Sequence, residues 1–130
     1  MWTREQLLEP REMPRQVVAV PEFGPDATVA IRGLSGLEWA DYNDALLVEN
    51  TRKQRRIETR RVQPCLVVRG VIGEKGERLL QDADWETVGK HWPAAVVQRL
   101  YLAIATLSGA GDEEPEKNSA SVPAASSSIT

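Results

Sequence analysis

Residues 93–107 carry apolar side chains on two sides of a predicted helix, and this segment constrains the fold more than any other. Pro93 suits the first position of a helix, where its missing N–H group has no partner, and Ser108-Gly109 ends the pattern. One stripe at helical spacing comprises Val96, Val97, Leu100, Ala103, Ile104 and Leu107. The opposite side gathers Ala94, Ala95, Tyr101, Leu102 and Ala105. Such a helix is either packed from both directions or presents its second face to another protein chain.

The first half of the chain combines a short arm, a β-hairpin and a helix. Residues 3–9 predict a short polar helix that cannot continue through Pro10 and Pro14. Residues 16–20 and 28–31 are rich in β-branched side chains and are separated by turn-forming residues, which predicts a hairpin. The motif Ser35-Gly36-Leu37-Glu38 matches a capping box, so a helix begins here. Trp39, Tyr42 and Leu46 share one face of that helix.

Residues 51–72 predict a second helical region. Thr51-x-x-Gln54 has capping-box spacing, either at the start of a new helix or within a longer one. Residues that recur at spacings of three and four are Ile57, Arg61, Cys65, Val68 and Ile72. Pro64 is expected to kink this helix or to begin its second half. A strand over residues 65–72 is the alternative, because this stretch is rich in valine.

The remaining segments are short, and together they define the expected fold class. A turn is predicted at residues 73–76, a small extended segment at 78–80, and a short helix capped by Asp82 or Asp84 that carries Trp85 and Val88 and ends at Gly89. The fold is expected to be mainly α (α+β), with an N-terminal β-hairpin followed by three to four helices. We expect an arm at residues 1–15, a single folded domain at 16–108 and a disordered tail, acidic and rich in Ser and Ala, at 109–130.

The formal net charge of −3 arises outside the predicted domain. Residues 1–108 hold 15 basic and 15 acidic side chains, whereas residues 109–130 hold four acidic side chains and one basic side chain. A neutral domain argues against a protein whose affinity comes mainly from neutralising phosphates, because that mode needs a basic excess. A local basic patch remains compatible with this balance.

Hydropathy and cysteine usage indicate where the protein works. The longest uninterrupted apolar run covers residues 100–105, far short of the roughly 20 residues that cross a bilayer. The N-terminal residues lack the apolar core of a signal peptide. Cys65 is the single cysteine, so no internal disulfide forms. We therefore expect a protein that is neither exported nor membrane-spanning and that works in a reducing cytoplasm.

Patterns that carry catalysis are missing from the sequence. A histidine-dependent mechanism would have to use His91, which lies at a helix junction, and one histidine with one cysteine excludes Cys/His metal sites. Neither common glycine-rich phosphate-binding motif occurs. The carboxylate pairs Asp41/Asp44 and Asp82/Asp84 lie where aspartate serves capping and solvation. We expect no enzymatic activity, no metal and no cofactor.

The densest run of charge lies in residues 52–61. It comprises Arg52, Lys53, Arg55, Arg56, Arg60 and Arg61, interrupted by Glu58. On a helix, Arg52, Arg55, Arg56 and Arg60 fall on one broad side, whereas Arg61 turns toward the core. Three interpretations stay open: a solvated helix face, a contact with nucleic acid, or a contact with an acidic partner protein whose carboxylates pair bidentately with arginine. The nucleic-acid interpretation lacks the interleaved aromatic residues that stack on bases.

The order of three segments carries a family resemblance. Ile31-Arg32-Gly33-Leu34-Ser35-Gly36-Leu37-Glu38-Trp39 enters a helix, residues 67–80 (VVRGVIGEKGERLL) precede Asp82-Ala83-Asp84, and residues 93–100 (PAAVVQRL) open a final helix that ends at Leu107-Ser108-Gly109. Over about residues 16–109, this order resembles the tail assembly chaperones of long-tailed (siphovirus-type) bacteriophages and prophages. The glycine-bounded stretch from Gly70 to Gly73 departs from the pattern, because a more helical sequence is expected there.

The resemblance implies a non-enzymatic role in the cytoplasm of a bacterial host. Such chaperones bind the tape measure protein, keep it soluble, help to recruit tail tube (major tail) protein subunits, and are absent from the finished particle. Many are made in two lengths by a −1 ribosomal frameshift near the end of the first reading frame. Glu116-Lys117-Asn118 is the candidate frameshift site, because the codons GAA-AAA-AAC would contain a slippery heptamer.

Under this interpretation, the candidate partner-binding residues are Arg52, Arg55, Arg56, Arg60, Tyr101 and Leu102. Several copies lined up on a long rod would gain avidity, so weak self-association is expected. The alternative is a small nucleic-acid-binding regulator that uses the basic helix 52–61. The neutral domain and the missing recognition motif make nucleic acid the less favoured partner.

Overall fold

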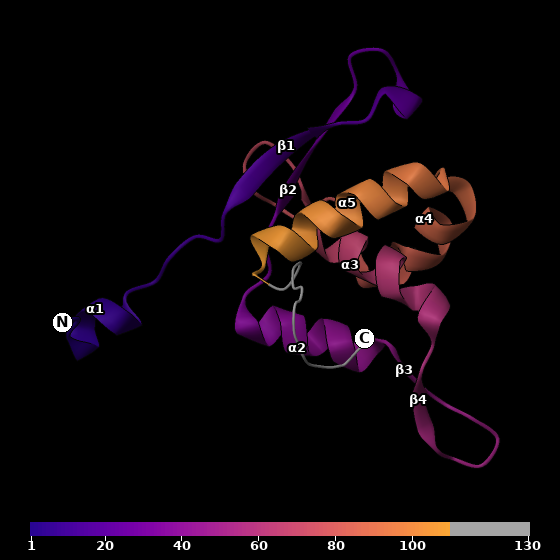
Figure 1. The fold of residues 1–130 in the computed structure, drawn as a ribbon, viewed down its shortest axis with the longest axis horizontal. Coiled ribbons are helices and arrows are strands. Elements are labelled where there is room, and N and C mark those ends of the chain that lie inside the picture. The colour runs from indigo at the N-terminus through magenta and orange to yellow at the C-terminus, as the bar shows by residue number, and fades with distance from the viewer. Residues whose placement is uncertain (110–130) are drawn as a thin grey trace, which may run out of the picture.

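The computed structural model describes residues 1–109, which form a mixed α+β fold (Figure 1). The helices of this part are α1 (Arg4–Leu8), α2 (Gly36–Ala45), α3 (Val62–Gly70), α4 (Trp85–His91) and α5 (Ala94–Leu107). The strands are β1 (Arg15–Ala19), β2 (Thr28–Arg32), β3 (Leu47–Glu49), β4 (Arg55–Ile57) and β5 (Val71–Ile72), and the 3-10 turns are η1 (Pro21–Phe23), η2 (Thr59–Arg61) and η3 (Asp82–Asp84). The predicted fold class, a β-hairpin followed by helices, is confirmed. The expected tail lies outside the described residues, apart from Gly109.

The predicted hairpin forms two strands of a three-stranded antiparallel sheet in the order β1-β2-β5. Val18 lies opposite Val29, and Ile31 lies opposite Val71, so these four side chains share one face of the sheet. Val18, Ile31 and Val71 are buried there in the hydrophobic core, and Val29 packs against it. The sheet therefore covers the core with one face and leaves its other face outside.

Helix α5 lies at the centre of the core and packs against α3 and β2 (Figure 1). Its predicted stripe is buried, with Val96, Leu100 and Ile104 fully enclosed. The second side divides: Ala105 is buried and Tyr101 is half-buried, whereas Ala94, Ala95 and Leu102 are exposed. The second side of α5 is thus packed into the core only in part, and its remainder is exposed.

The capping box at the start of α2 is confirmed. The Ser35 hydroxyl accepts a hydrogen bond from the Glu38 N–H group at 3.3 Å, and the Glu38 carboxylate accepts one from the Ser35 N–H group at 2.9 Å. Farther along α2, Tyr42 is buried, and its hydroxyl donates to the Val62 carbonyl at 2.6 Å. This hydrogen bond ties α2 to the start of α3.

The prediction of a basic helix over residues 52–61 is wrong. Strands β3 and β4 pair as an antiparallel hairpin, with Leu47 opposite Ile57. The Asn50 side chain accepts hydrogen bonds from the N–H groups of Arg52 (2.9 Å) and Gln54 (3.0 Å), which stabilises a turn. Lys53 adopts a left-handed backbone with φ of 60°, a conformation that no helix residue uses. Thr51 and Gln54 therefore belong to the turn and not to a capping box.

Residues 62–72 contain both of the alternatives predicted for residues 65–72. Helix α3 runs to Gly70, and the two residues of β5 then pair with β2. Pro64 is the third residue of α3, within the first turn, where N–H groups have no intrahelical partner. It therefore neither kinks a longer helix nor starts the second half of one.

The last segments follow the predictions with shifted boundaries. The turn at residues 73–76 is present, and Arg78 forms a β-bridge with Ile72. Helix α4 passes through Gly89 and ends at His91. Pro93 lies just before α5, where its carbonyl accepts from the N–H groups of Val96 and Val97, so α5 starts one residue later than predicted.

Candidate functional site

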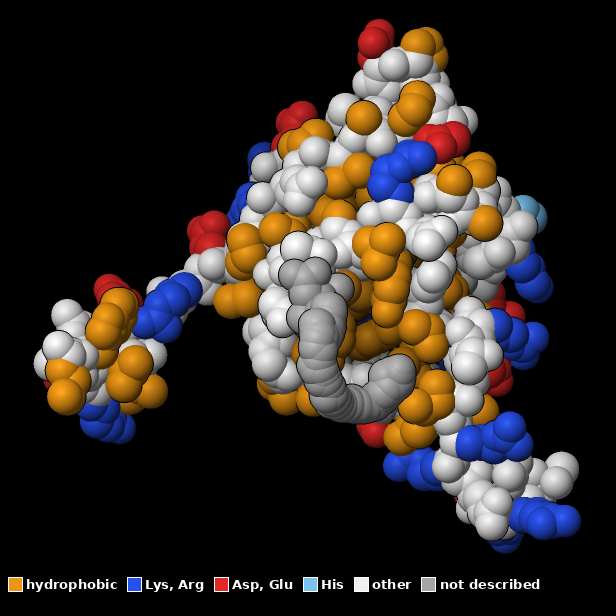
Figure 2. All heavy atoms as spheres, in the orientation of Figure 1, with side chains coloured by type: hydrophobic (Ala, Val, Ile, Leu, Met, Phe, Trp, Pro, Cys, Tyr) orange, Lys and Arg blue, Asp and Glu red, His pale blue; other side chains and the backbone are white. Residues whose placement is uncertain are grey.

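Residues 47–57 form a projecting hairpin that we call the basic hairpin. It comprises β3, β4 and their turn, and it extends away from the body of the molecule (Figure 1). Its cationic side chains are Arg52, Lys53, Arg55 and Arg56, against a single acid, Glu49. All four cationic residues are exposed, and Figure 2 shows Lys and Arg side chains gathered at this end of the molecule. The hairpin is therefore a local basic surface on a charge-balanced body.

The hairpin strands place charge and apolar surface together. Side chains two residues apart on a strand share a face, so Arg55 and Ile57 point to the same side. Ile57 is 57% exposed, although it is a large apolar residue. Arg56 points to the opposite side, beside its partner Val48. Each face of the ribbon thus combines a guanidinium group with an aliphatic side chain.

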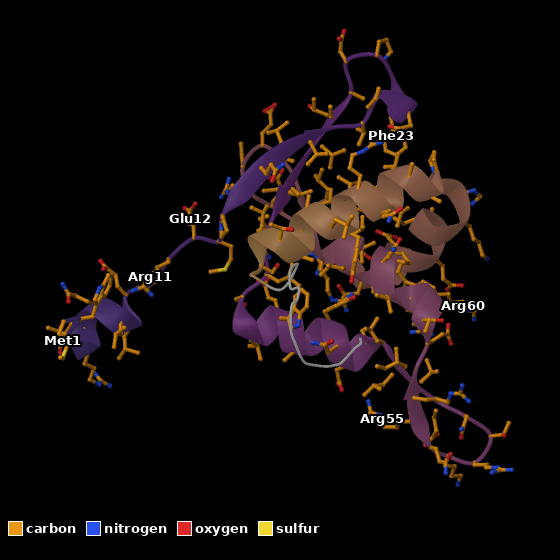
Figure 3. The ribbon with its side chains drawn as sticks, in the orientation of Figure 1. Met1, Arg11, Glu12, Phe23, Arg55 and Arg60 are labelled. Atoms are coloured by element: carbon orange, nitrogen blue, oxygen red, sulfur yellow. The ribbon has the colours of Figure 1, made fainter. Side chains whose placement is uncertain are left out.

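Ion pairs at the base of the hairpin hold its orientation. The Arg55 guanidinium lies 3.4 Å from the Asp44 carboxylate on α2, and the Arg60 Nε atom donates to Glu58 at 2.6 Å (Arg55 and Arg60 are labelled in Figure 3). The hydrogen bond from Arg60 is the main reason why the pKa of Glu58 is lowered. The Arg61 guanidinium lies 4.6 Å from the Trp85 ring centroid, in a cation–π contact. Arg60 and Arg61 therefore fix the base of the hairpin, whereas the cations toward its tip point into solvent.

The candidate residues on α5 do not join the basic hairpin. Tyr101 is half-buried and packs against the core, and burial raises the pKa of its hydroxyl. Leu102 is 48% exposed. In Figure 1, α2 and α3 lie between α5 and the hairpin. The six candidate residues therefore do not form one continuous surface. The four arginines lie on the basic hairpin and at its base, and Tyr101 and Leu102 lie on α5.

Two further surfaces were not identified from the sequence as candidates for binding. One is the N-terminal arm, residues 1–14, whose α1 contains no buried residue and exposes Trp2, Leu7 and Leu8. The other is the sheet groove, a hollow of about 500 Å³ beside the β1-β2-β5 sheet. Its lining includes Val17, Ala30 and Ile72 from the outer face of the sheet, Val29 and Val71 from the inner face, and Phe23, Leu79, Leu80 and Trp92 from neighbouring segments. Three large apolar residues close to the N-terminus were the available signal for the arm. The groove brings together residues from six separate segments, so no local sequence pattern predicts it.

A smaller polar pocket of about 380 Å³ lies beside α3 and contains Cys65, Arg69 and Asp82. Arg69 donates to the Cys65 carbonyl at 2.9 Å and lies 3.4 Å from the Asp82 carboxylate, which also pairs with Arg78 at 2.9 Å. Burial raises the pKa of the Cys65 thiol, which disfavours the reactive thiolate. The charged side chains in this pocket pair with one another. Their ion pairs join α3 to η3, and the pocket offers no activated group.

The carboxylates singled out in the sequence have structural partners or lie exposed. Asp84 accepts a hydrogen bond from the Gln81 N–H group at 2.7 Å, and Asp82 and Asp44 form the ion pairs described above. His91 is exposed at the end of α4. Within residues 1–109, no group of three or more His, Cys, Asp and Glu side chains is placed to hold a metal ion.

Two further expectations concern membrane-spanning helices and the candidate frameshift site. Over residues 1–109, none of them has the length and apolar character needed to span a bilayer. The candidate frameshift residues Glu116, Lys117 and Asn118 lie outside the described residues. The candidate binding surfaces in the described part of the chain are the basic hairpin, the exposed side of α5, the arm and the sheet groove. Comparison of the chain with protein-family models, curated proteins and solved structures finds no match.

Proposed function

We propose that this chain is a tail assembly chaperone of a long-tailed bacteriophage or prophage. It acts in the cytoplasm of the bacterial host, binds the tape measure protein, keeps it soluble and helps to recruit tail tube subunits. Support comes from the sequence resemblance over about residues 16–109 and from a structure whose distinctive surfaces suit binding. The protein is not an enzyme under this proposal and needs no cofactor.

The basic hairpin is the observation that carries the proposal. Between the end of α2 at Ala45 and the start of α3 at Val62, the chain builds a projecting ribbon whose strand β4 is exposed throughout. Among the described residues, no carboxylate pairs with Arg52, Lys53 or Arg56. Charged side chains that neither pair nor support the core are available to a partner.

The chemistry of the hairpin selects the kind of partner segment. Arg55 and Ile57 on one face fit an amphipathic helix that carries carboxylates beside apolar side chains, because arginine pairs bidentately with carboxylates and isoleucine covers apolar surface. One such contact is small and weak. A long helical rod presents many similar segments, so copies bound side by side mask its apolar surface together.

Co-purification tests the assignment of this surface. The tape measure protein is co-expressed with the tagged chain, either unaltered or carrying Arg55→Glu with Arg56→Glu. We expect the double substitution to reduce the captured tape measure protein at least tenfold with little change in thermal stability, because both side chains are exposed and the exposed ion pair of Arg55 with Asp44 contributes little to stability. Lys75→Glu with Lys90→Glu is the matched control, since it makes the same charge change at exposed positions outside the hairpin.

Two outcomes would contradict the proposal. Equal capture by the hairpin variant would remove the hairpin from the binding surface, and failure of the unaltered chain to capture the tape measure protein would overturn the function. A two-stranded basic ribbon also fits a DNA groove. Salt-dependent binding of the chain to DNA, lost with the two arginine substitutions, would therefore favour a nucleic-acid-binding regulator.

The proposal includes a longer product made by frameshifting. The gene then encodes Glu116-Lys117-Asn118 with the codons GAA-AAA-AAC, follows a tail tube gene and precedes a very long reading frame. Codons without the repeated adenines would remove these three residues as the frameshift site.

A further inference from the structure

The N-terminal arm is a preformed apolar element that its own body does not cover. A helix of five residues is far shorter than the roughly 12–15 residues that an isolated helix needs in water. Both ends of α1 are nevertheless capped. Thr3 and Gln6 form a capping box, and the Arg11 guanidinium donates to the carbonyls of Gln6 (2.7 Å) and Leu7 (3.3 Å).

The apolar side chains of the arm face solvent. The Arg11 guanidinium lies 5.5 Å from the Trp2 ring centroid, which fixes the indole beside α1. Trp2 is 61% exposed, and Leu7 and Leu8 are exposed to a similar degree. Figure 2 shows hydrophobic side chains on this element, well separated from the body. Met1 is exposed as well. An ordered element with four large uncovered apolar side chains is suited to bind an apolar surface.

The linker directs the arm away from the body that carries it. The Pro14 carbonyl accepts a hydrogen bond from the Gly33 N–H group at 2.9 Å, so the linker leaves the sheet at a fixed point. Pro10 and Pro14 hold their own φ angles, and the residues before them, Glu9 and Met13, are restricted to extended backbone. Met1 and Arg11 accordingly lie far from the body in Figure 3. A return to the outer face of the same sheet would need a sharp reversal within this stiff segment.

The middle of the outer face of the sheet is apolar where an exposed face is normally polar, whereas Arg15 and Arg32 lie opposite each other at one end of it. Val17 lies opposite Ala30, and Ala30 lies opposite Ile72, so these residues form one row across three strands. Leu79 continues the apolar surface beside β5, and Phe23 stacks edge-to-face on Trp92 at its far end, with ring centroids 5.2 Å apart. Val17 is 66% exposed and Leu79 is 58% exposed. Ile72 is buried, and Thr28 and Glu74 also line the hollow. The sheet groove is thus a mainly apolar hollow with exposed side chains at its rim, within the size range of sites for compact ligands.

We propose that the N-terminal arm of one copy docks into the sheet groove of a second copy of this chain. Each chain carries one arm and one groove, so a copy-to-copy contact covers both surfaces in equal numbers. The linker, which keeps the arm off its own sheet, extends it toward a neighbour. The inference goes beyond the proposed function, because both halves of the contact belong to this chain and neither the tape measure protein nor the tail tube protein takes part.

The geometry of the exchange determines the assemblies that form. The contact joins two different surfaces, the arm of one copy and the groove of another. A reciprocal exchange about a two-fold axis closes as a dimer, whereas a one-way exchange continues to further copies. The arm offers only four large exposed apolar side chains, those of Met1, Trp2, Leu7 and Leu8, to each groove. The association is therefore reversible and depends on protein concentration.

Sedimentation velocity of the full chain over a hundredfold range of concentration tests the proposal. The unaltered chain is expected to shift from monomer to larger species. The arm variant Leu7→Glu with Leu8→Glu and the groove variant Val17→Glu with Leu79→Glu are each expected to stay monomeric. Leu37→Glu is the control, because Leu37 is 74% exposed on α2, outside both surfaces, and this variant should associate like the unaltered chain. Circular dichroism confirms that each variant is folded.

Mixing the two variants separates arm exchange from any other self-contact. The groove variant still carries an intact arm, and the arm variant still carries an intact groove, so an equimolar mixture is expected to form heterodimers although neither variant associates alone. A synthetic peptide of residues 1–14 should dissociate the unaltered oligomer and provides a test that needs no groove substitution. Three results would overturn the proposal: an unaltered chain that is monomeric at every concentration, a mixture of the two variants that does not associate, or a peptide that has no effect on the oligomer.

Discussion

The ion pair between Arg32 and Glu38 links the end of β2 to the first turn of α2. The Arg32 Nη1 atom donates to the Glu38 carboxylate at 2.9 Å and also to the Gly33 carbonyl at 3.1 Å. The hydrogen bonding of Arg32 to the Glu38 carboxylate, with a further contribution from the Ser35 N–H group, lowers the pKa of Glu38 to about 2. One carboxylate thus serves both the ion pair and the capping box, so its protonation weakens two contacts together.

A stability measurement against pH tests this pair. Because the pKa of Glu38 is lower in the folded state than its ordinary value of 4.5, the pair contributes stability above about pH 4.5 and loses it as the pH falls toward 2. We expect Glu38→Gln to lower the free energy of unfolding at pH 7 and to flatten its decline below pH 4.5. Asp41→Asn, at an exposed position on the same helix, is the control. Urea titrations across this range would contradict the assignment if both variants declined with the slope of the unaltered chain.

The crossing of α3 and α5 depends on a glycine. A Cβ atom built on Gly70 would lie 2.5 Å from the Ile104 Cδ1 atom, inside any acceptable contact distance. Gly70 ends α3, which packs against α5, and Val71 immediately enters β5. The glycine that looked like a departure from a helical pattern is therefore a requirement of close packing.

Substitution at this crossing should be costly. We expect Gly70→Ala to destabilise the fold by about 1–3 kcal/mol through overpacking. Removal of the opposing side chain relieves the clash, so Gly70→Ala combined with Ile104→Ala should cost less than the sum of the two single changes. Gly36→Ala, where nothing lies within 4 Å of the added Cβ atom, should leave stability nearly unchanged. Additive free energies in the double-mutant cycle would contradict this explanation.

The sequence predicted elements wherever a local signal decided them. Ser35 and Glu38 fixed the start of α2, and β-branched runs fixed the β1-β2 hairpin. Residues 51–61 were misjudged because Asn50, whose side chain holds the turn, stands before the charged run, and helical spacing alone does not reveal the pairing of Leu47 with Ile57. The candidate arginines were identified individually, but their arrangement depended on that pairing. The sheet groove was missed because strand register is a tertiary property.

At the scale of the whole molecule, residues 1–109 form one core with two appendages. The basic hairpin and the N-terminal arm extend from different ends of the body (Figure 1). Neither α1 nor the hairpin strands contain a buried residue. The core and the surfaces proposed for binding are therefore largely separate, and a substitution can alter one with little effect on the other.

Removal of the arm tests this separation. Deletion of residues 1–12 is expected to change the free energy of unfolding by no more than about 0.5 kcal/mol in dilute solution, because only exposed contacts are lost. Residues 13–14 are kept because the Pro14 carbonyl pairs with Gly33. Chemical denaturation at low protein concentration makes the measurement, and a loss well above 1 kcal/mol would show that the arm supports the body.

Helix α5 is the last described element and also the centre of the core. The Leu34 N–H group donates to the Ser108 hydroxyl at 2.8 Å, and Gly33 lies against the Leu107 carbonyl, so the end of α5 holds the joint between β2 and α2. During synthesis, the sheet, α2 and α3 leave the ribosome before the helix that covers them exists. The nascent chain consequently keeps its apolar surfaces open until residue 108 has emerged, and the order of translation makes folding a single late event.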